Sequence, residues 1–185
     1  HVAFVAGPVA EKPGTTFFSK IQGLEFLGLI TTGAGLIGAG TPIICNGANI
    51  AYRKSAFVEV NGYGETSTSC DDETLMQRIS TRTIGGIVFN ANVDAKVVTS
   101  SSSSPFEFWN QRMRWAAKRG HYEDKSILVK LISLYTFFVV FFSVALISFF
   151  QPELQFPVAA IFFAKMVIDF QTLTFGSRLL KENVP

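Results

Sequence analysis

The feature that most constrains this chain is an apolar run without a charged residue, which extends from Leu131 to Phe150. An α-helix needs about 20 such residues to cross roughly 30 Å of hydrocarbon, so we predict a transmembrane helix here. The composition agrees, since hydrophobic residues make up 48% of the 185 residues and charged residues only 16%. An ordinary soluble domain carries roughly 25% charged residues. The chain is therefore predicted to lie partly in a lipid bilayer.

A second apolar segment, residues 154–175, follows a short turn at residues 151–153 and predicts a returning helix. Lys165 and Asp169 in this segment are four residues apart, so they lie on one helix face and can pair. A structural ion pair is the simpler interpretation, and a functional ion pathway is the alternative. Basic residues flank the two segments on their outer sides, namely Lys118, Arg119, Lys125, Arg178 and Lys181. The excess of positive charge predicts that both ends of this hairpin face the cytoplasm.

Residues 1–104 alternate segments typical of strands and helices, which predicts an α/β fold. We expect strands at residues 2–5, 86–89 and 95–99, helices at residues 17–29, 53–60 and 71–80, and a loop at residues 9–16. The glycines of residues 31–40, followed by Pro42, favour an interfacial or buried segment there over a further membrane span. Residues 105–125 predict a basic amphipathic helix with two tryptophans, a composition typical of a membrane surface.

Two classes of partner are disfavoured by charge and by cysteine spacing. The net charge is only +2, and no basic stripe alternates with aromatic residues, so nucleic acid is not expected as a partner. Cys45 and Cys70 have no CxxC or Cys/His spacing, so we expect reduced thiols rather than metal ligands.

Three local patterns carry side chains suited to chemistry. The first is Asn46-Gly47-Ala48-Asn49, a tight loop whose amides either line a pocket or serve only the turn. The second is the pair Asp71 and Asp72 at a predicted helix start, where carboxylates either act as a general base or cap the helix.

The third pattern is Gln111-Arg-Met-Arg-Trp115 on the amphipathic helix. Gln111, Arg114 and Trp115 are spaced by three and four residues, so they can share one helix face. An Arg and an indole in this arrangement can hold a phosphate and stack on a sugar or base. The simpler interpretation is a membrane-surface helix with snorkelling arginines.

Taken together and in this order, the three patterns resemble inverting family 2 glycosyltransferases of the GT-A fold. The resemblance covers essentially the whole chain and is to the membrane-bound branch with a QxxRW motif, which includes cellulose, chitin and hyaluronan synthases and ceramide glucosyltransferases. QxxRW directly before a membrane span is its most specific element. The implied fold is the C-terminal half of a GT-A domain (residues 1–104), an interfacial helix (105–125) and two transmembrane helices (126–181).

The resemblance implies roles for the three patterns. The acidic motif supplies the base that deprotonates the acceptor hydroxyl, and alignment on Leu75 assigns that base to Asp72, with Asp71 where the family often has Glu. Gln111, Arg114 and Trp115 would border the acceptor and the donor diphosphate. Asn46, Gly47 and Asn49 would line the sugar pocket.

The family also requires a nucleotide-binding unit and a DxD motif that holds a divalent cation, Mg²⁺ or Mn²⁺. Neither occurs in these residues. His1–Pro8 corresponds to the region just after the expected DxD motif, so we expect a longer parent protein and an inactive fragment. The expected partners are a nucleotide-sugar donor, a lipid-linked or glycan acceptor and the bilayer. The expected location is a membrane, in a bacterium the inner one, with the catalytic part cytoplasmic.

A different class remains open beside this interpretation. A small membrane protein such as a transporter subunit would use Lys165 and Asp169 as its working pair. It would keep its function without Asp72 and Trp115 and lose it without Asp169. A third alternative is a degenerate, non-catalytic membrane-anchoring relative.

Overall fold

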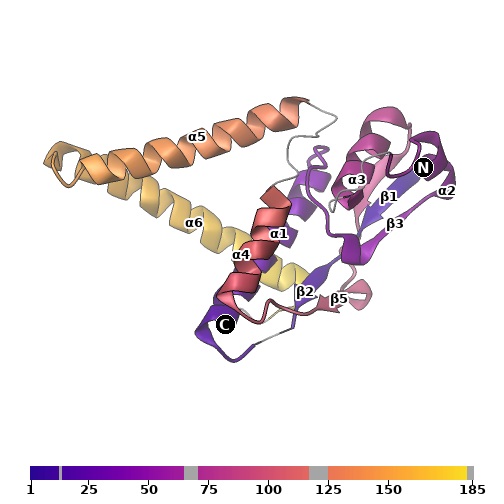
Figure 1. The fold of residues 1–185 in the computed structure, drawn as a ribbon, viewed down its shortest axis with the longest axis horizontal. Helices are drawn as coiled ribbons and strands as arrows, with labels where there is room; N and C mark the ends of the chain where they lie inside the picture. The colour runs from indigo at the N-terminus through magenta and orange to yellow at the C-terminus, as the bar shows by residue number, and fades with distance from the viewer. Residues whose placement is uncertain (13, 65–70, 117–124, 183–185) are drawn as a thin grey trace.

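The computed structural model describes residues 1–12, 14–64, 71–116 and 125–182, and combines two small sheets with three long apolar helices (Figure 1). The strands are β1 (Val2–Ala6), β2 (Val9–Glu11), β3 (Ile50–Tyr52), β4 (Gly86–Phe89) and β5 (Val97–Thr99). The α-helices are α1 (Phe17–Gly38), α2 (Lys54–Glu59), α3 (Asp71–Arg82), α4 (Pro105–Ala116), α5 (Lys125–Ile147) and α6 (Gln155–Leu180). Short 3₁₀ turns are η1 (Gly47–Asn49), η2 (Val93–Ala95) and η3 (Pro152–Leu154).

Strand β1 lies at the centre of the larger sheet, antiparallel to β3 and parallel to β4. A parallel pair needs a crossover connection, which here contains α1, α2 and α3. The strands predicted at residues 2–5 and 86–89 are thereby confirmed. The strand predicted at residues 95–99 begins two residues later, after η2.

The prediction of a loop at residues 9–16 is wrong at its start, because Val9–Glu11 form β2. This strand pairs in parallel with β5, and Val9 lies opposite Val97. Such a short strand has too few residues to show an alternating pattern. Its partner lies far away in the sequence, so only the folded chain reveals the pairing.

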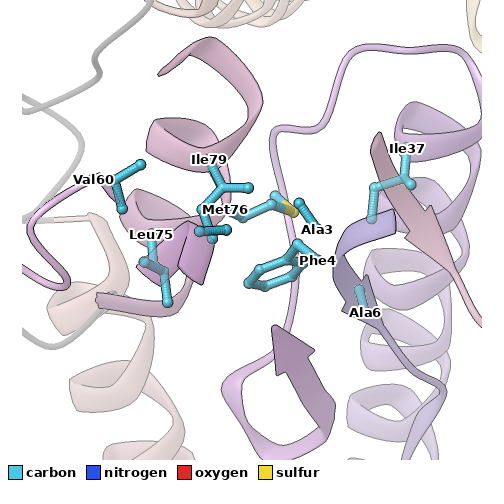
Figure 2. Close-up of a cluster of buried hydrophobic side chains, with 9 residues drawn as sticks. Ala3, Phe4, Ala6, Ile37, Val60, Leu75, Met76 and Ile79 are labelled. Atoms are coloured by element: carbon cyan, nitrogen blue, oxygen red, sulfur yellow. The ribbon is translucent and has the colours of Figure 1, made fainter. Parts of the chain in front are cut away.

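The first core cluster, which we call the sheet core, packs β1 against α3 and the end of α1. Figure 2 shows Leu75, Met76 and Ile79 of α3 on one side of the cluster and Ile37 of α1 on the other. The remaining members are Ala3, Phe4, Ala6, Ala56 and Val60. The three residues from α3 are fully buried. Their spacing of one, three and four residues lies on one helix face, as the helix predicted at residues 71–80 requires.

The second cluster, which we call the junction core, lies where α1, α6 and β2 meet. It consists of Val9, Phe26, Leu27, Ile30 and Leu180. Small residues bring α1 and α6 close together. A Cβ atom added at Gly176 of α6 would lie 2.0 Å from the Thr31 hydroxyl of α1. That hydroxyl is fixed, since it donates a hydrogen bond of 2.7 Å to the Leu27 carbonyl.

Within the described ranges, three helices are long and apolar enough to cross a membrane: α1, α5 and the segment Pro152–Leu180 that contains α6. The two predicted spans therefore form long helices. We predicted that the first helix would end near residue 29, whereas α1 continues to Gly38. Gly33 packs within reach of the Ile44 carbonyl, where an added Cβ would lie only 2.9 Å away. Tertiary packing thus outweighs the low helix propensity of the glycines.

The apolar side chains of α5 and α6 are largely not covered by other parts of the protein. In the most apolar stretch of α5, 6% is buried inside the protein. In the most apolar stretch of Pro152–Leu180, the buried share is 0%. In Figure 1 both helices extend away from the sheets as a hairpin joined through η3. Apolar surface of this extent requires a lipid or protein environment.

Candidate functional site

The contact between Gly47 and Asp72 brings the Asn46–Asn49 loop to the first turn of α3. A Cβ atom added at Gly47 would lie 2.9 Å from Oδ2 of Asp72 and 3.3 Å from its Cβ and Cγ atoms. The Asp72 carboxylate therefore lies directly against the backbone of Gly47. The Asp72 side chain is half-buried. A larger residue at position 47 would displace the carboxylate, so the glycine is required by this contact.

Asn46 shapes the loop on one side of that contact. Its side-chain oxygen accepts a hydrogen bond of 3.0 Å from the Ala48 amide and so caps η1. Asp71 is the first residue of α3, and its side chain lies outside the described part of the structure, as does Cys70.

Asn49 fastens the other end of the loop. Its amide nitrogen donates to the Pro8 carbonyl at 2.8 Å and to the Ala95 carbonyl at 2.7 Å. Its own backbone carbonyl accepts from the Gly7 amide at 2.8 Å. Asn49 was predicted to line a sugar pocket, but both its N–H groups bond to the protein. They tie η1 to the β1–β2 turn and to η2.

The QxxRW segment on α4 is organised by Arg112, which was not among the predicted site residues. Its guanidinium donates to both carboxylate oxygens of Glu25 on α1, at 3.0 Å for the bond from Nε. It also donates to Oε1 of Gln111 at 2.8 Å. The guanidinium carbon lies 4.3 Å from the ring centre of Phe108 and 4.2 Å from that of Trp115. A bidentate ion pair between two aromatic faces fixes α4 to α1.

The three predicted residues of this segment have different surroundings. Trp115 is half-buried and packs against the junction core, and Gln111 is half-buried beside Arg112. Arg114 is exposed. The helical spacing predicted a shared face for all three, and the structure shows two half-buried residues and one solvent-facing residue.

The structure therefore holds two groups of candidate residues by separate contacts. Asp72 and the Asn46–Asn49 loop adjoin the sheet core, whereas Gln111 and Trp115 adjoin the junction core. Phe89, the last residue of β4, packs against both cores and connects them.

A buried polar pair next to α4 was missed by sequence reasoning. Nε2 of Gln22, a buried residue of α1, donates to Oε1 of Glu11 at 3.3 Å. Burial raises the pKa of Glu11, although the Gln22 bond and the Arg112 charge act in the opposite direction. Among the described residues, Oε2 of Glu11 and Oε1 of Gln22 are buried without a hydrogen-bond partner.

One signal for this group was present in the sequence. Glu25 interrupts the apolar face of the helix predicted at residues 17–29, and Arg112 lies inside the QxxRW window. An acid on a predicted core-facing stripe indicates a charged partner. Which basic residue is that partner depends on the placement of α4, which local patterns do not contain.

The divalent cation that the resemblance implies has no ligand set in the described ranges. No group of three or more His, Cys, Asp or Glu side chains there could hold a metal ion. Comparison of the chain with protein-family models, curated proteins and solved structures finds no match.

Proposed function

We propose that this chain is part of an inverting family 2 glycosyltransferase of the QxxRW branch, with a C-terminal portion of a GT-A domain and a membrane hairpin. It would transfer a sugar from a nucleotide-sugar donor to a lipid-linked or glycan acceptor. The observation that carries the proposal is the contact of Asp72 with Gly47. It joins two of the three patterns that define the resemblance, although they are far apart in the sequence.

In the proposed reaction, the Asp72 carboxylate accepts the proton of the acceptor hydroxyl. The acceptor oxygen forms a bond to the anomeric carbon while the bond from that carbon to the diphosphate breaks, so the configuration inverts. Gly47 carries no side chain, so the Asp72 carboxylate can lie directly against the backbone of the Asn46–Asn49 loop. Arg114 is exposed on α4, and its guanidinium is suited to the charge of the leaving diphosphate. A divalent cation, when bound by a DxD motif elsewhere in a parent protein, supplies further neutralising charge.

The test measures release of nucleoside diphosphate by the parent protein in membranes, with a panel of nucleotide sugars. Asp72→Asn keeps the size of the side chain and removes its basicity, so turnover should fall by about a hundredfold or more. Glu59→Gln is the matched control, because it neutralises an exposed carboxylate on α2 and should leave turnover unchanged. Full turnover by Asp72→Asn would show that another residue acts as the general base.

Asp169→Asn separates this proposal from the transporter alternative. Asp169 forms an ion pair with Lys165 along α6, as its spacing predicted. A transferase should keep its turnover in this variant, since Asp169 lies on α6 and belongs to none of the three patterns. Absence of turnover and of donor binding in the wild type, with transport lost in Asp169→Asn, would support the transporter instead.

A further inference from the structure

A cavity of about 120 Å³ lies between β2, the first half of α1 and the end of α6, away from Asp72. Its walls are largely apolar and include Val9, Phe26, Leu27 and Leu180 of the junction core. An engineered apolar cavity of about 150 Å³ binds benzene. The cavity is somewhat smaller than this and has room for a short run of methylenes.

The cavity also has a cationic rim. Lys12 and Lys20 line it and are exposed. Glu182 lines it too, but this carboxylate forms an ion pair with Lys96, which offsets its charge. Glu11, the remaining acidic lining residue, is half-buried and bonded to Gln22, whereas both lysines are exposed. The two lysines thus place positive charge at the edge of an apolar interior.

The position of the cavity in the fold indicates which kind of ligand carries both an apolar group and a negative charge. Two of the three helices that are long enough to cross a membrane, α1 and α6, form walls of the cavity. It lies at the C-terminal end of α6, where Arg178 and Lys181 follow the apolar stretch. Basic residues at this position are typical of the level of the lipid headgroups. An apolar chain and an anionic headgroup would reach the cavity together from the bilayer surface.

We propose that this cavity binds a single-chain lipid phosphate, with its alkyl chain between Phe26, Leu27 and Leu180 and its phosphate at Lys12 and Lys20. This site does not depend on the proposed transferase reaction, because none of these residues belongs to the QxxRW segment or to the group formed by Asp72 and the Asn46–Asn49 loop. The lipid chain buries apolar surface that is otherwise in contact with water. The two ammonium groups form charge-assisted hydrogen bonds with the phosphate oxygens.

Gly23 and Gly35 provide a matched pair of variants for the test. Both lie on α1, and at both an added Cβ would meet no atom within 4 Å, but only Gly23 lines the cavity. Leu has a higher helix propensity than Gly, so both Leu variants should fold. Gly23→Leu places an isobutyl group in the cavity, whereas Gly35→Leu adds the same group elsewhere.

The experiment titrates the purified chain in a non-ionic detergent with decyl phosphate and counts bound ligands by native mass spectrometry. We expect one saturable site in the wild type and in Gly35→Leu, and at least tenfold weaker binding in Gly23→Leu (about 1.4 kcal/mol). Replacing both Lys12 and Lys20 with Gln should also weaken binding by roughly tenfold, because charge-assisted bonds to the phosphate are lost. Circular dichroism checks that each variant is helical.

Two further ligands distinguish the sources of binding. Decanol and inorganic phosphate should each bind much more weakly than decyl phosphate, since each lacks one half of the recognised chemistry. Equal binding of inorganic phosphate would reveal a simple anion site, and equal binding of decanol would exclude a role for the lysines. Equal affinity of the two Leu variants for decyl phosphate would place the ligand outside this cavity. Each of these results would overturn the proposal.

Discussion

The sheet core encloses its apolar side chains within the protein, whereas the α5–α6 hairpin leaves its apolar side chains exposed. In the sheet core, Leu75, Met76 and Ile79 are fully enclosed by protein (Figure 2). Along α5 and α6, large apolar side chains such as Phe142 and Phe163 are exposed. The same residue types are therefore stabilised by packing in one region and need a different surrounding medium in the other. The comparison indicates that protein packing stabilises the α/β part, whereas the transfer of apolar side chains into another medium stabilises the hairpin.

The largest effect is expected from a cavity in the sheet core. Leu75→Ala should lower the free energy of unfolding by about 2–5 kcal/mol, because a fully buried Leu loses both its burial and its packing contacts. Leu146→Ala on α5 is the matched variant, since this leucine is 65% exposed. Thermal unfolding in detergent should show a clear decrease for Leu75→Ala and little change for Leu146→Ala. Equal decreases would mean that the hairpin also packs against protein.

A charge placed on two equally exposed valines tests the membrane environment directly. Val139 of α5 and Val58 of α2 are each 66% exposed. At the centre of a membrane helix a lysine costs about 2.5–3.5 kcal/mol on the insertion scale. Val139→Lys should therefore reduce membrane insertion in a translocation assay, whereas Val58→Lys should be neutral. If both variants insert and fold like the wild type, α5 lies in water or against a soluble partner.

The contact of α1 with α6 links the two regions and should tolerate little added volume. Gly176→Leu would force a side chain into Thr31 and Leu27, so it should destabilise the protein by about 1–3 kcal/mol. Gly35→Leu, which meets nothing within 4 Å, is the control. Thermal unfolding of the two variants should differ by several degrees. A harmless Gly176→Leu would show that α6 moves freely relative to α1.

The smallest effects concern two carboxylates with opposite pKa shifts. Burial raises the pKa of Glu11, so its contribution to stability is present in acid and is lost as the pH rises through the folded-state value. Glu11→Gln should therefore stabilise the protein at neutral pH and lose this advantage in acid. A melting temperature that responds identically to pH in wild type and variant would contradict a buried acid at this position.

Glu107 provides the opposite case. Hydrogen bonds from the side chain and backbone of Ser103 lower its pKa, so its contribution is present above the ordinary Glu value and is lost as the pH falls. Glu107→Gln should be slightly less stable than the wild type at neutral pH and equal to it in acid. As the pH rises from about 4 to about 8, the melting temperature of Glu11→Gln should rise relative to the wild type and that of Glu107→Gln should fall relative to it.

Sequence reasoning was most successful where local periodicity carries the information. The uncharged run from Leu131 predicted a long helix, and α5 contains most of it. The helix predicted at residues 53–60 ends as expected, because Asn61 and Gly62 have positive φ angles of 58° and 56°. The pairing of Lys165 with Asp169 was also confirmed, since helical spacing alone determines which residues share a face. The cytoplasmic orientation remains a prediction, and Lys118 and Arg119 lie outside the described residues.

The sequence by itself determined the two apolar helices of the hairpin, the α/β alternation and the residue types available for chemistry, because each depends on neighbours within a few turns. Only the tertiary structure decided that Asp72 lies against Gly47, that Arg112 bonds to Glu25, and that Val9 begins a strand. These contacts join residues far apart in the chain, and their formation depends on how α1, α4 and the sheets pack. Local patterns state which side chains are present, and packing determines which of them meet.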